Sequence, residues 1–204
     1  MKLSNFKRKR KPIIALICEG KNQTESKFFN HFNTRENNYN LKIIPSEATD
    51  PNSMAKKAKR FIDEMQLDSK LGDKVYCVID IDLSITRYEK IKQESQKSNK
   101  KCQVEFVLSN PCFEIWLLYY YTKNPKVETS SQKVKDQLKK YVPQYFESYD
   151  IVKECNLVSK HKEAIINAKL KNKTFDENAS PLEKNPYTEI PYLIEKLFKY
   201  NNEN

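Results

Sequence analysis

Acidic residues follow two apolar segments of the sequence directly. Glu19 comes after the run IIALIC, and Asp80 and Asp82 stand near the end of the segment KVYCVIDIDLS. On an extended strand, two aspartates two positions apart point to the same side, where their charges repel each other unless a cation lies between them. Carboxylates with open positions are the ligands that Mg²⁺ and Mn²⁺ prefer. We therefore expect Glu19, Asp80 and Asp82 to bind such a metal; for any single acid, the alternative is a helix cap or a salt bridge to lysine.

Other residues could complete this site. Glu114, one turn into a helix predicted after the segment CQVEFVLS, would be a further metal ligand or would orient one. Gly20, one of only two glycines, would let the backbone turn and a phosphate approach closely. Thr24, at the start of the next helix, adds a favourable position for an anion. In an enzyme, Ser109 and Asn110 would lie beside the phosphate of the substrate. Lys21 or Lys160 could neutralise the negative charge that develops in the transition state.

The periods of the apolar residues predict the elements that position these side chains. Short apolar segments predict strands at 13–18, 41–48, 74–84 and 102–109. Helical periods lie between them: from about Thr24, over 53–67 with Ser53 as N-cap, over 85–97, and over 110–121 with Asn110 as N-cap. Strands that alternate with helices indicate a parallel sheet, and ligands bind at the carboxyl ends of such strands. We therefore predict an α/β fold with a mainly parallel sheet flanked by helices.

The chain divides into three parts by composition. Residues 1–12 are predicted to be a basic flexible arm, because a run of like charges repels itself. Residues 13–122 form the predicted α/β domain. Residues 123–204 are rich in Lys, Tyr and Asn and show helical periods at 131–142, 159–171 and 187–200, without a clear strand. We expect this last part to be a helical extension packed on the domain.

Aromatic residues of the segment NPCFEIWLLYYY are predicted to be core residues. Phe113, Trp116 and Tyr120 share one helical face at the spacing i, i+3, i+7, which is the pattern of an ordinary buried helix face. Glu114 lies off that face and stays available for the site. His161, between two lysines, is expected at the surface.

The composition favours a polyanionic partner. The 204-residue chain has a net charge of +10, which points most simply to nucleic acid; a merely soluble, lysine-rich surface is the alternative. The five cysteines include no C-x-x-C pair, and neither histidine has a spacing that suits zinc. No apolar stretch approaches the roughly 18 residues of a membrane span, and no signal peptide is recognisable. We expect a cytoplasmic protein with reduced cysteines and no membrane partner.

The order of these motifs resembles a known family. Glu19 after the first strand and Asp80-Ile81-Asp82 after the third look like a Toprim domain. The segments CEGKNQTESKFF, DID, SNPCFEIWLL and NPYTEIPYLIEKL resemble more closely the RloB-like, or AbiLii-like, family, with the match thinning between 123 and 184. Three residues separate Gly20 from Thr24 where two are commoner in the family, which leaves the role of Glu25 open.

The resemblance implies a phage-defence protein of the abortive-infection type, often encoded beside an AAA/ABC-type ATPase. By analogy with OLD-type Toprim enzymes it also implies a Mg²⁺- or Mn²⁺-dependent nuclease, in which Glu19, Asp80, Asp82 and Glu114 would be catalytic and would hold the metal. A non-catalytic sensor or adaptor subunit of an ATPase-based system, binding nucleic acid or a nucleotide through the same acids, is the alternative. The sequence leaves open whether the substrate is DNA or RNA and whether the protein is a homo-oligomer.

Overall fold

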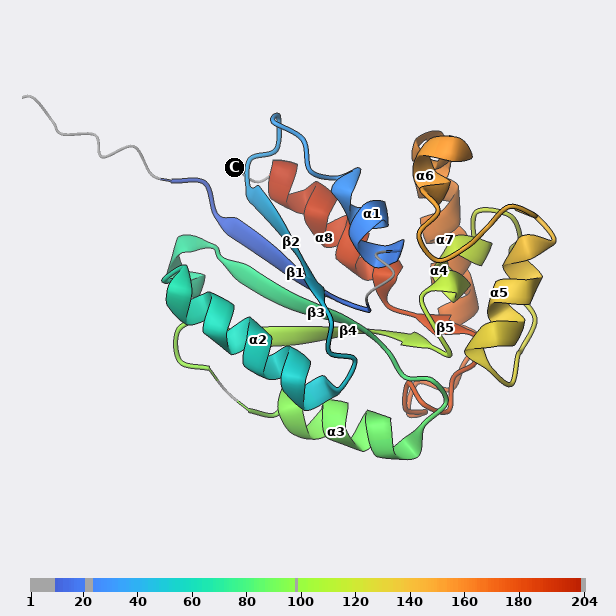
Figure 1. Cartoon of the computed structure of the whole chain (residues 1–204), viewed down its shortest axis with the longest axis horizontal. Helices are drawn as coiled ribbons and strands as arrows, with labels where there is room; N and C mark the ends of the chain where they lie inside the picture. The colour runs from blue at the N-terminus through green and yellow to red at the C-terminus, as the bar shows by residue number, and fades with distance from the viewer. Residues whose placement is uncertain (1–9, 21–23, 98, 203–204) are drawn as a thin grey trace, which may run out of the picture.

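The fold is built on one mostly parallel sheet. The computed structural model describes residues 10–20, 24–97 and 99–202. Its strands are β1 (Ile13–Glu19), β2 (Asn40–Ser46), β3 (Lys74–Asp80), β4 (Val104–Asn110) and β5 (Tyr187–Thr188). Within the described residues they form a five-stranded sheet in the order β2-β1-β3-β4-β5, in which β5 alone runs antiparallel to its neighbour (Figure 1). The predicted mainly parallel sheet flanked by helices is confirmed.

Helices cover both faces of this sheet (Figure 1). Short 3₁₀ helices cover Ser69–Leu71 and Leu157–Lys160. The α-helices are α1 (Thr24–Asn30), α2 (Pro51–Glu64), α3 (Ile85–Ser95), α4 (Glu114–Leu118), α5 (Ser131–Lys139), α6 (Ile151–Glu154), α7 (His161–Asn172) and α8 (Ile190–Asn202).

The central strands are apolar on both sides because two separate cores bury them. On β1, Ile14 and Leu16 pack into the core formed with α1, α4 and α8. Ala15 and Ile17 point the other way, into the core formed with α2 and α3. Each fully buried isoleucine or leucine side chain of this kind contributes roughly 1.5–3 kcal/mol. The two cores hold the carboxyl ends of β1 and β3 in fixed positions.

One predicted helix start is displaced by three residues. Ser53 is not the N-cap of α2; Asp50 is, with its Oδ2 accepting a hydrogen bond of 3.1 Å from the Ser53 backbone N–H. Pro51 occupies the first helical position, where its missing N–H costs nothing.

The prediction that Asn110 caps a helix is also wrong. Strand β4 continues through Asn110, and α4 begins only at Glu114. The Asn110 side chain accepts a hydrogen bond of 3.2 Å from the Leu83 N–H and donates to carbonyl oxygens of the loop 181–184. It therefore joins the loop after β3 to a distant loop. The predicted burial of Phe113, Trp116 and Tyr120 is confirmed, although α4 is short.

The C-terminal part is helical and shares a core with the sheet. Residues such as Val134 on α5 and Leu197 on α8 are fully buried in the same cluster as Ile14 of β1. The expectation of no strand in this part is wrong, because Tyr187 and Thr188 pair with the end of β4. Two residues are too few to show a strand pattern in a sequence.

Part of the basic N-terminal segment is anchored. The Arg10 guanidinium donates to both carboxylate oxygens of Asp73, at 2.8 and 2.6 Å. The rest of the predicted arm, residues 1–9, lies outside the described residues. The longest described helix, α2, has 14 residues, and no helix in the described part of the chain has the length and apolarity to cross a bilayer.

Candidate functional site

A cavity of about 240 Å³ lies where β1 and β3 end. All four acids that the sequence singled out line it, as do Gly20 and Thr24. We call it the acidic cavity; its described lining residues are Glu19, Gly20, Thr24, Glu25, Thr49, Asp80, Asp82, Cys112, Glu114, Ser131, Lys135 and Glu147. They come from the ends of the central strands, from α1, α4 and α5, and from loops.

Glu19 and Asp80 are held together by the register of β1 and β3. The Asp80 backbone N–H donates a hydrogen bond of 2.9 Å to Glu19 Oε2. The carboxylate of Asp80 itself makes no hydrogen bond or ion pair with any other residue that the structure describes. An acidic side chain that lines a cavity and lacks a partner is open to bind a cation or a proton.

The backbone conformation that places Asp82 at the cavity differs from the one that the sequence predicts. Strand β3 ends at Asp80, and both Asp82 and Leu83 have φ of 55°. The expectation that Asp80 and Asp82 point the same way along an extended strand is therefore wrong. Asp82 instead accepts a hydrogen bond of 2.9 Å from the Ser131 hydroxyl of α5 and lies 3.6 Å from the Arg87 guanidinium.

Arg87, on the first turn of α3, is the cation closest to these acids among the described residues. Its guanidinium pairs with Glu19 and donates a hydrogen bond of 2.5 Å to the Asp80 carbonyl. Burial raises the pKa of Glu19, and the Arg87 charge only partly offsets that effect. Sequence reasoning missed Arg87, because it lies in a polar helix where charged residues are common. The one feature of the sequence that could have pointed to Arg87 is its position five residues after Asp82.

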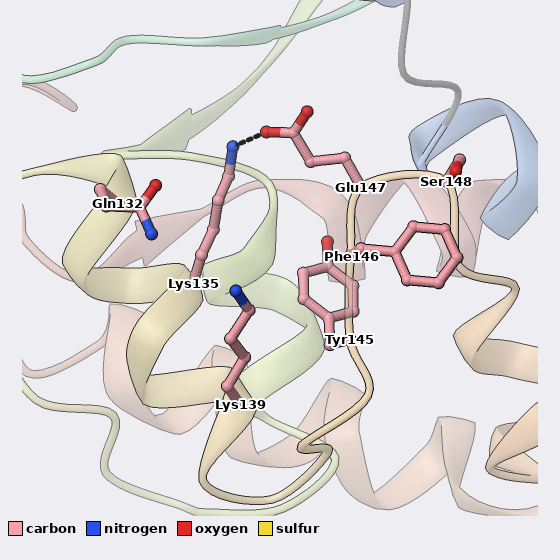
Figure 2. A pocket seen from close by; sticks show the side chains of 7 residues that line it. All are labelled: Gln132, Lys135, Lys139, Tyr145, Phe146, Glu147 and Ser148. Carbon is pink, nitrogen blue, oxygen red and sulfur yellow. Dashed lines mark hydrogen bonds and ion pairs between the residues drawn. The ribbon is translucent and has the colours of Figure 1, made fainter.

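Residues of the C-terminal part complete the other side of the cavity. The Tyr145 hydroxyl donates a hydrogen bond of 2.9 Å to Glu114 Oε1, and Lys135 Nζ lies 3.9 Å from the same oxygen. Lys135 also pairs with Glu147 (Figure 2). Burial alone would lower the pKa of Lys135, but the charges of Glu114 and Glu147 raise it. Sequence reasoning missed these residues because they lie where the family motifs thin out.

The acids raise one another's pKa values. Burial raises the pKa of Asp80 well above its ordinary value, and the charges of Glu19, Glu25 and Glu114 raise it further. Burial, followed by the charges of Glu114 and Glu19, raises the pKa of Glu25 to about 8. The cavity therefore favours additional positive charge, as a proton or as a metal ion.

A divalent metal fits the chemistry of this cavity. Within the described parts of the chain, no three His, Cys, Asp or Glu side chains are already arranged around a metal position. The donors are nevertheless the hard oxygen ligands that Mg²⁺ and Mn²⁺ take, and no described residue competes for the Asp80 carboxylate. Glu19 and Asp82 would have to share their carboxylates between a metal and Arg87.

The other predicted phosphate-binding residues lie in different surroundings. Gly20 has φ of 91°, a conformation that suits glycine, and Thr24 donates its hydroxyl hydrogen to the Glu147 carbonyl. Ser109 and Asn110 are buried beside the cavity rather than lining it, and the Ser109 hydroxyl is 3.0 Å from that of Thr188. Lys160, at the end of a 3₁₀ helix, does not line the cavity either. Lys21 lies outside the described residues.

His161 is not at the surface, as the sequence suggested, but buried. Its Nδ1 lies 2.6 Å from the Tyr120 hydroxyl, and its ring stacks on Phe32. Burial lowers its pKa to about 4, so the ring is neutral at physiological pH. It is a core residue, away from the acidic cavity.

Comparison with known proteins identifies the family. Searches of curated proteins and of solved structures returned no match. A model of the RloB family, described as "RloB-like protein", matches residues 14–197. That range contains β2 to β5, all of β1 except its first residue, and every described residue of the acidic cavity. The chain therefore belongs to the RloB-like family.

Proposed function

We propose that the acidic cavity hydrolyses phosphodiester bonds in nucleic acid with the help of Mg²⁺ or Mn²⁺. The observation that carries the proposal is the Asp80 carboxylate, which has no partner in the described part of the chain and lies among other carboxyl groups at the carboxyl end of a parallel sheet. The net charge of +10 supports nucleic acid as the substrate. The order Glu19, Asp80, Asp82 supports a Toprim-type arrangement.

Glu19, Asp80, Asp82 and Glu114 would hold the metal, which when bound supplies Lewis-acid activation of the phosphodiester and of water. Arg87 orients Glu19 and Asp82 through its guanidinium. Lys135, whose pKa is raised, keeps its positive charge beside Glu114 and can balance charge on a phosphate. Gly20 lets a phosphate approach the backbone at the cavity wall.

The biological role follows from the family rather than from the cavity. We propose that the protein acts in phage defence together with an AAA/ABC-type ATPase, by analogy with the family that its motifs resemble. The ATPase would control when the cavity receives nucleic acid.

A second candidate function is a non-catalytic sensor or adaptor. Two observations favour it: Arg87 and Lys135 already pair with acids of the cavity, and no three-ligand group is formed among the described residues. In that case the cavity would bind nucleic acid or a nucleotide without cleaving it.

Cleavage assays separate the two functions. Purified protein is incubated with single- and double-stranded DNA and RNA in Mg²⁺, in Mn²⁺ and in EDTA, with and without the neighbouring ATPase. Asp80→Asn is compared with Asp63→Asn, a matched control at an exposed acid that pairs with Lys101. We expect metal-dependent cleavage by the wild type and by Asp63→Asn, and none by Asp80→Asn. Nucleic acid that is bound but never cleaved would favour the sensor.

A further inference from the structure

A second cavity, of opposite character, adjoins the acidic one. It has a volume of about 390 Å³ and lies between helix α5 and the loop 145–148 (Figure 2). We call it the α5 cleft; it is lined by Gln132, Lys135, Lys139, Tyr145, Phe146, Glu147 and Ser148. Lys135 and Glu147 line both cavities, so a molecule in the α5 cleft would lie directly beside the acids.

Lys139 is a cation without an assigned role in the fold. It lies one turn after Lys135 on α5, so the two side chains share a helix face, and Figure 2 shows both on the cleft side of the helix. Lys135 is already engaged with Glu114 and Glu147. Lys139 is exposed and makes no hydrogen bond or ion pair with another residue in the described ranges. It is therefore available to an anionic ligand.

Phe146 is an exposed ring at the same cleft. Its exposed fraction is 57%, although the residues on either side of it are engaged. Tyr145 is buried with its hydroxyl on Glu114, and Glu147 pairs with Lys135. These two contacts fix the loop, so the ring between them is presented by an anchored backbone. Figure 2 shows the ring on the other side of the loop backbone from Lys135 and Lys139, so a ligand that used both would extend across the edge of the loop. Proteins hold single-stranded nucleic acid with basic side chains along its backbone and exposed rings on which its bases stack.

We propose that the α5 cleft and the adjoining Phe146 ring bind one nucleotide of a single-stranded nucleic acid, with a phosphate on Lys139 in the cleft and the base stacked on Phe146 across the edge of the loop. The next phosphodiester then enters the acidic cavity across Lys135. The volume is within the range of roughly 300–1,000 Å³ for small-molecule sites, which suits one nucleotide. The bases of a duplex are already stacked and paired, so a duplex offers the ring no free base face. Stacking reads no base edge, so binding is tolerant of sequence. This inference rests on the proposed function, whose substrate it specifies.

Binding measured without cleavage tests the cleft. Fluorescently labelled single-stranded DNA and RNA oligonucleotides, the corresponding duplexes, and AMP as competitor are titrated in EDTA. Phe146→Leu removes the ring and should weaken single-strand binding roughly tenfold, whereas Phe146→Trp should preserve it. Lys139→Gln should weaken binding. It should also reduce the slope of the logarithm of the binding constant against the logarithm of salt concentration by about one, the value for one lost phosphate contact. Lys140→Gln, at the adjacent exposed lysine that does not line the cleft, should bind as the wild type does.

Several results would overturn the proposal. They are no oligonucleotide binding by the wild type, unchanged affinity in Phe146→Leu, or duplex binding as tight as single-strand binding. If AMP competes as well as an oligonucleotide does, the ligand of the cleft is a free nucleotide and not a nucleic acid. Cleavage that is unaffected in both Phe146→Leu and Lys139→Gln would reject the cleft and keep the nuclease. Single-strand binding that depends on Phe146, without any cleavage, would keep the cleft and reject the nuclease.

Discussion

The Asp80 backbone N–H donates to the Glu19 carboxylate, and this hydrogen bond of 2.9 Å joins the last residues of two neighbouring parallel strands. It uses one oxygen of Glu19 and leaves the Asp80 carboxylate without a partner among the described residues. Glu19 is therefore held by the fold itself, whereas under the proposed function the Asp80 carboxylate would gain its partner from a bound cation. The two acids should respond differently to substitution.

Asp80→Asn should leave the metal-free protein as stable as the wild type or make it more stable, because it removes repulsion from Glu19, Glu25 and Glu114. Mn²⁺ at a hundredfold excess over its dissociation constant should stabilise the wild type by about 2.7 kcal/mol and should not stabilise the variant. Thermal melts in EDTA and in Mn²⁺ measure both effects. A destabilised variant that still gains stability from Mn²⁺ would exclude Asp80 as a ligand.

Glu25 should make the metal-free protein less stable as the pH rises. Its pKa is raised on folding from 4.5 to about 8, so the folded state binds the proton more tightly than the unfolded state does. The resulting stability is fully present below pH 4.5 and is lost as the pH rises to about 8, by at most about 1.4 kcal/mol per pH unit for one proton. Glu25→Gln should flatten this decline between pH 5 and 8 in EDTA. Glu64→Gln, at an exposed position on α2, should show the wild-type slope; equal slopes in all three proteins would contradict the assignment.

Arg87→Gln should destabilise the metal-free protein by about 2–4 kcal/mol, because it leaves the largely buried Glu19 without its cation. Lys101→Gln is the control, since its ion pair with Asp63 is exposed and should contribute at most about 1 kcal/mol. Urea unfolding in EDTA measures both. Mn²⁺ should recover part of the loss in Arg87→Gln. Similar losses in the two variants would mean that Arg87 acts only as a surface charge.

Asn110→Ala separates a structural role from phosphate binding. The buried Asn110 amide bonds to the Leu83 N–H and to three carbonyls of the loop 181–184. Its loss should cost about 3 kcal/mol or more, because several buried polar groups lose a partner. Asn178→Ala, in an exposed loop, should stay within about 0.5 kcal/mol of the wild type. If Asn110→Ala is as stable as the wild type but binds oligonucleotides more weakly, Asn110 contacts phosphate as the sequence suggested.

The sequence predicts the central strands and the acids at their ends better than it predicts the residues that surround these acids. Strands β1 and β3 are recognisable because burial on both faces requires a continuous apolar run, and Glu19 and Asp80 stand out because each ends such a run. Lys135 lies on a helix whose period the sequence shows, but Tyr145 and Glu147 lie in the loop after it. Their positions depend on how α5 and its loop pack against α4, which no local pattern encodes. Asp82, with its left-handed backbone, likewise contacts residues distant in the sequence: its N–H donates to the Pro111 carbonyl and its carboxylate accepts from Ser131.

The contacts of Asn110 with the loop 181–184 have a consequence for synthesis on the ribosome. All the strands that carry Glu19 and Asp80 emerge early, because a chain is made from its N-terminus. Lys135 and Tyr145 come later, and the partners of Asn110 and of β4 come later still, at 181–188. A nascent or prematurely terminated chain therefore carries the acids without the groups that surround them. The order of translation itself therefore delays a finished cavity until residues 181–188 have been made.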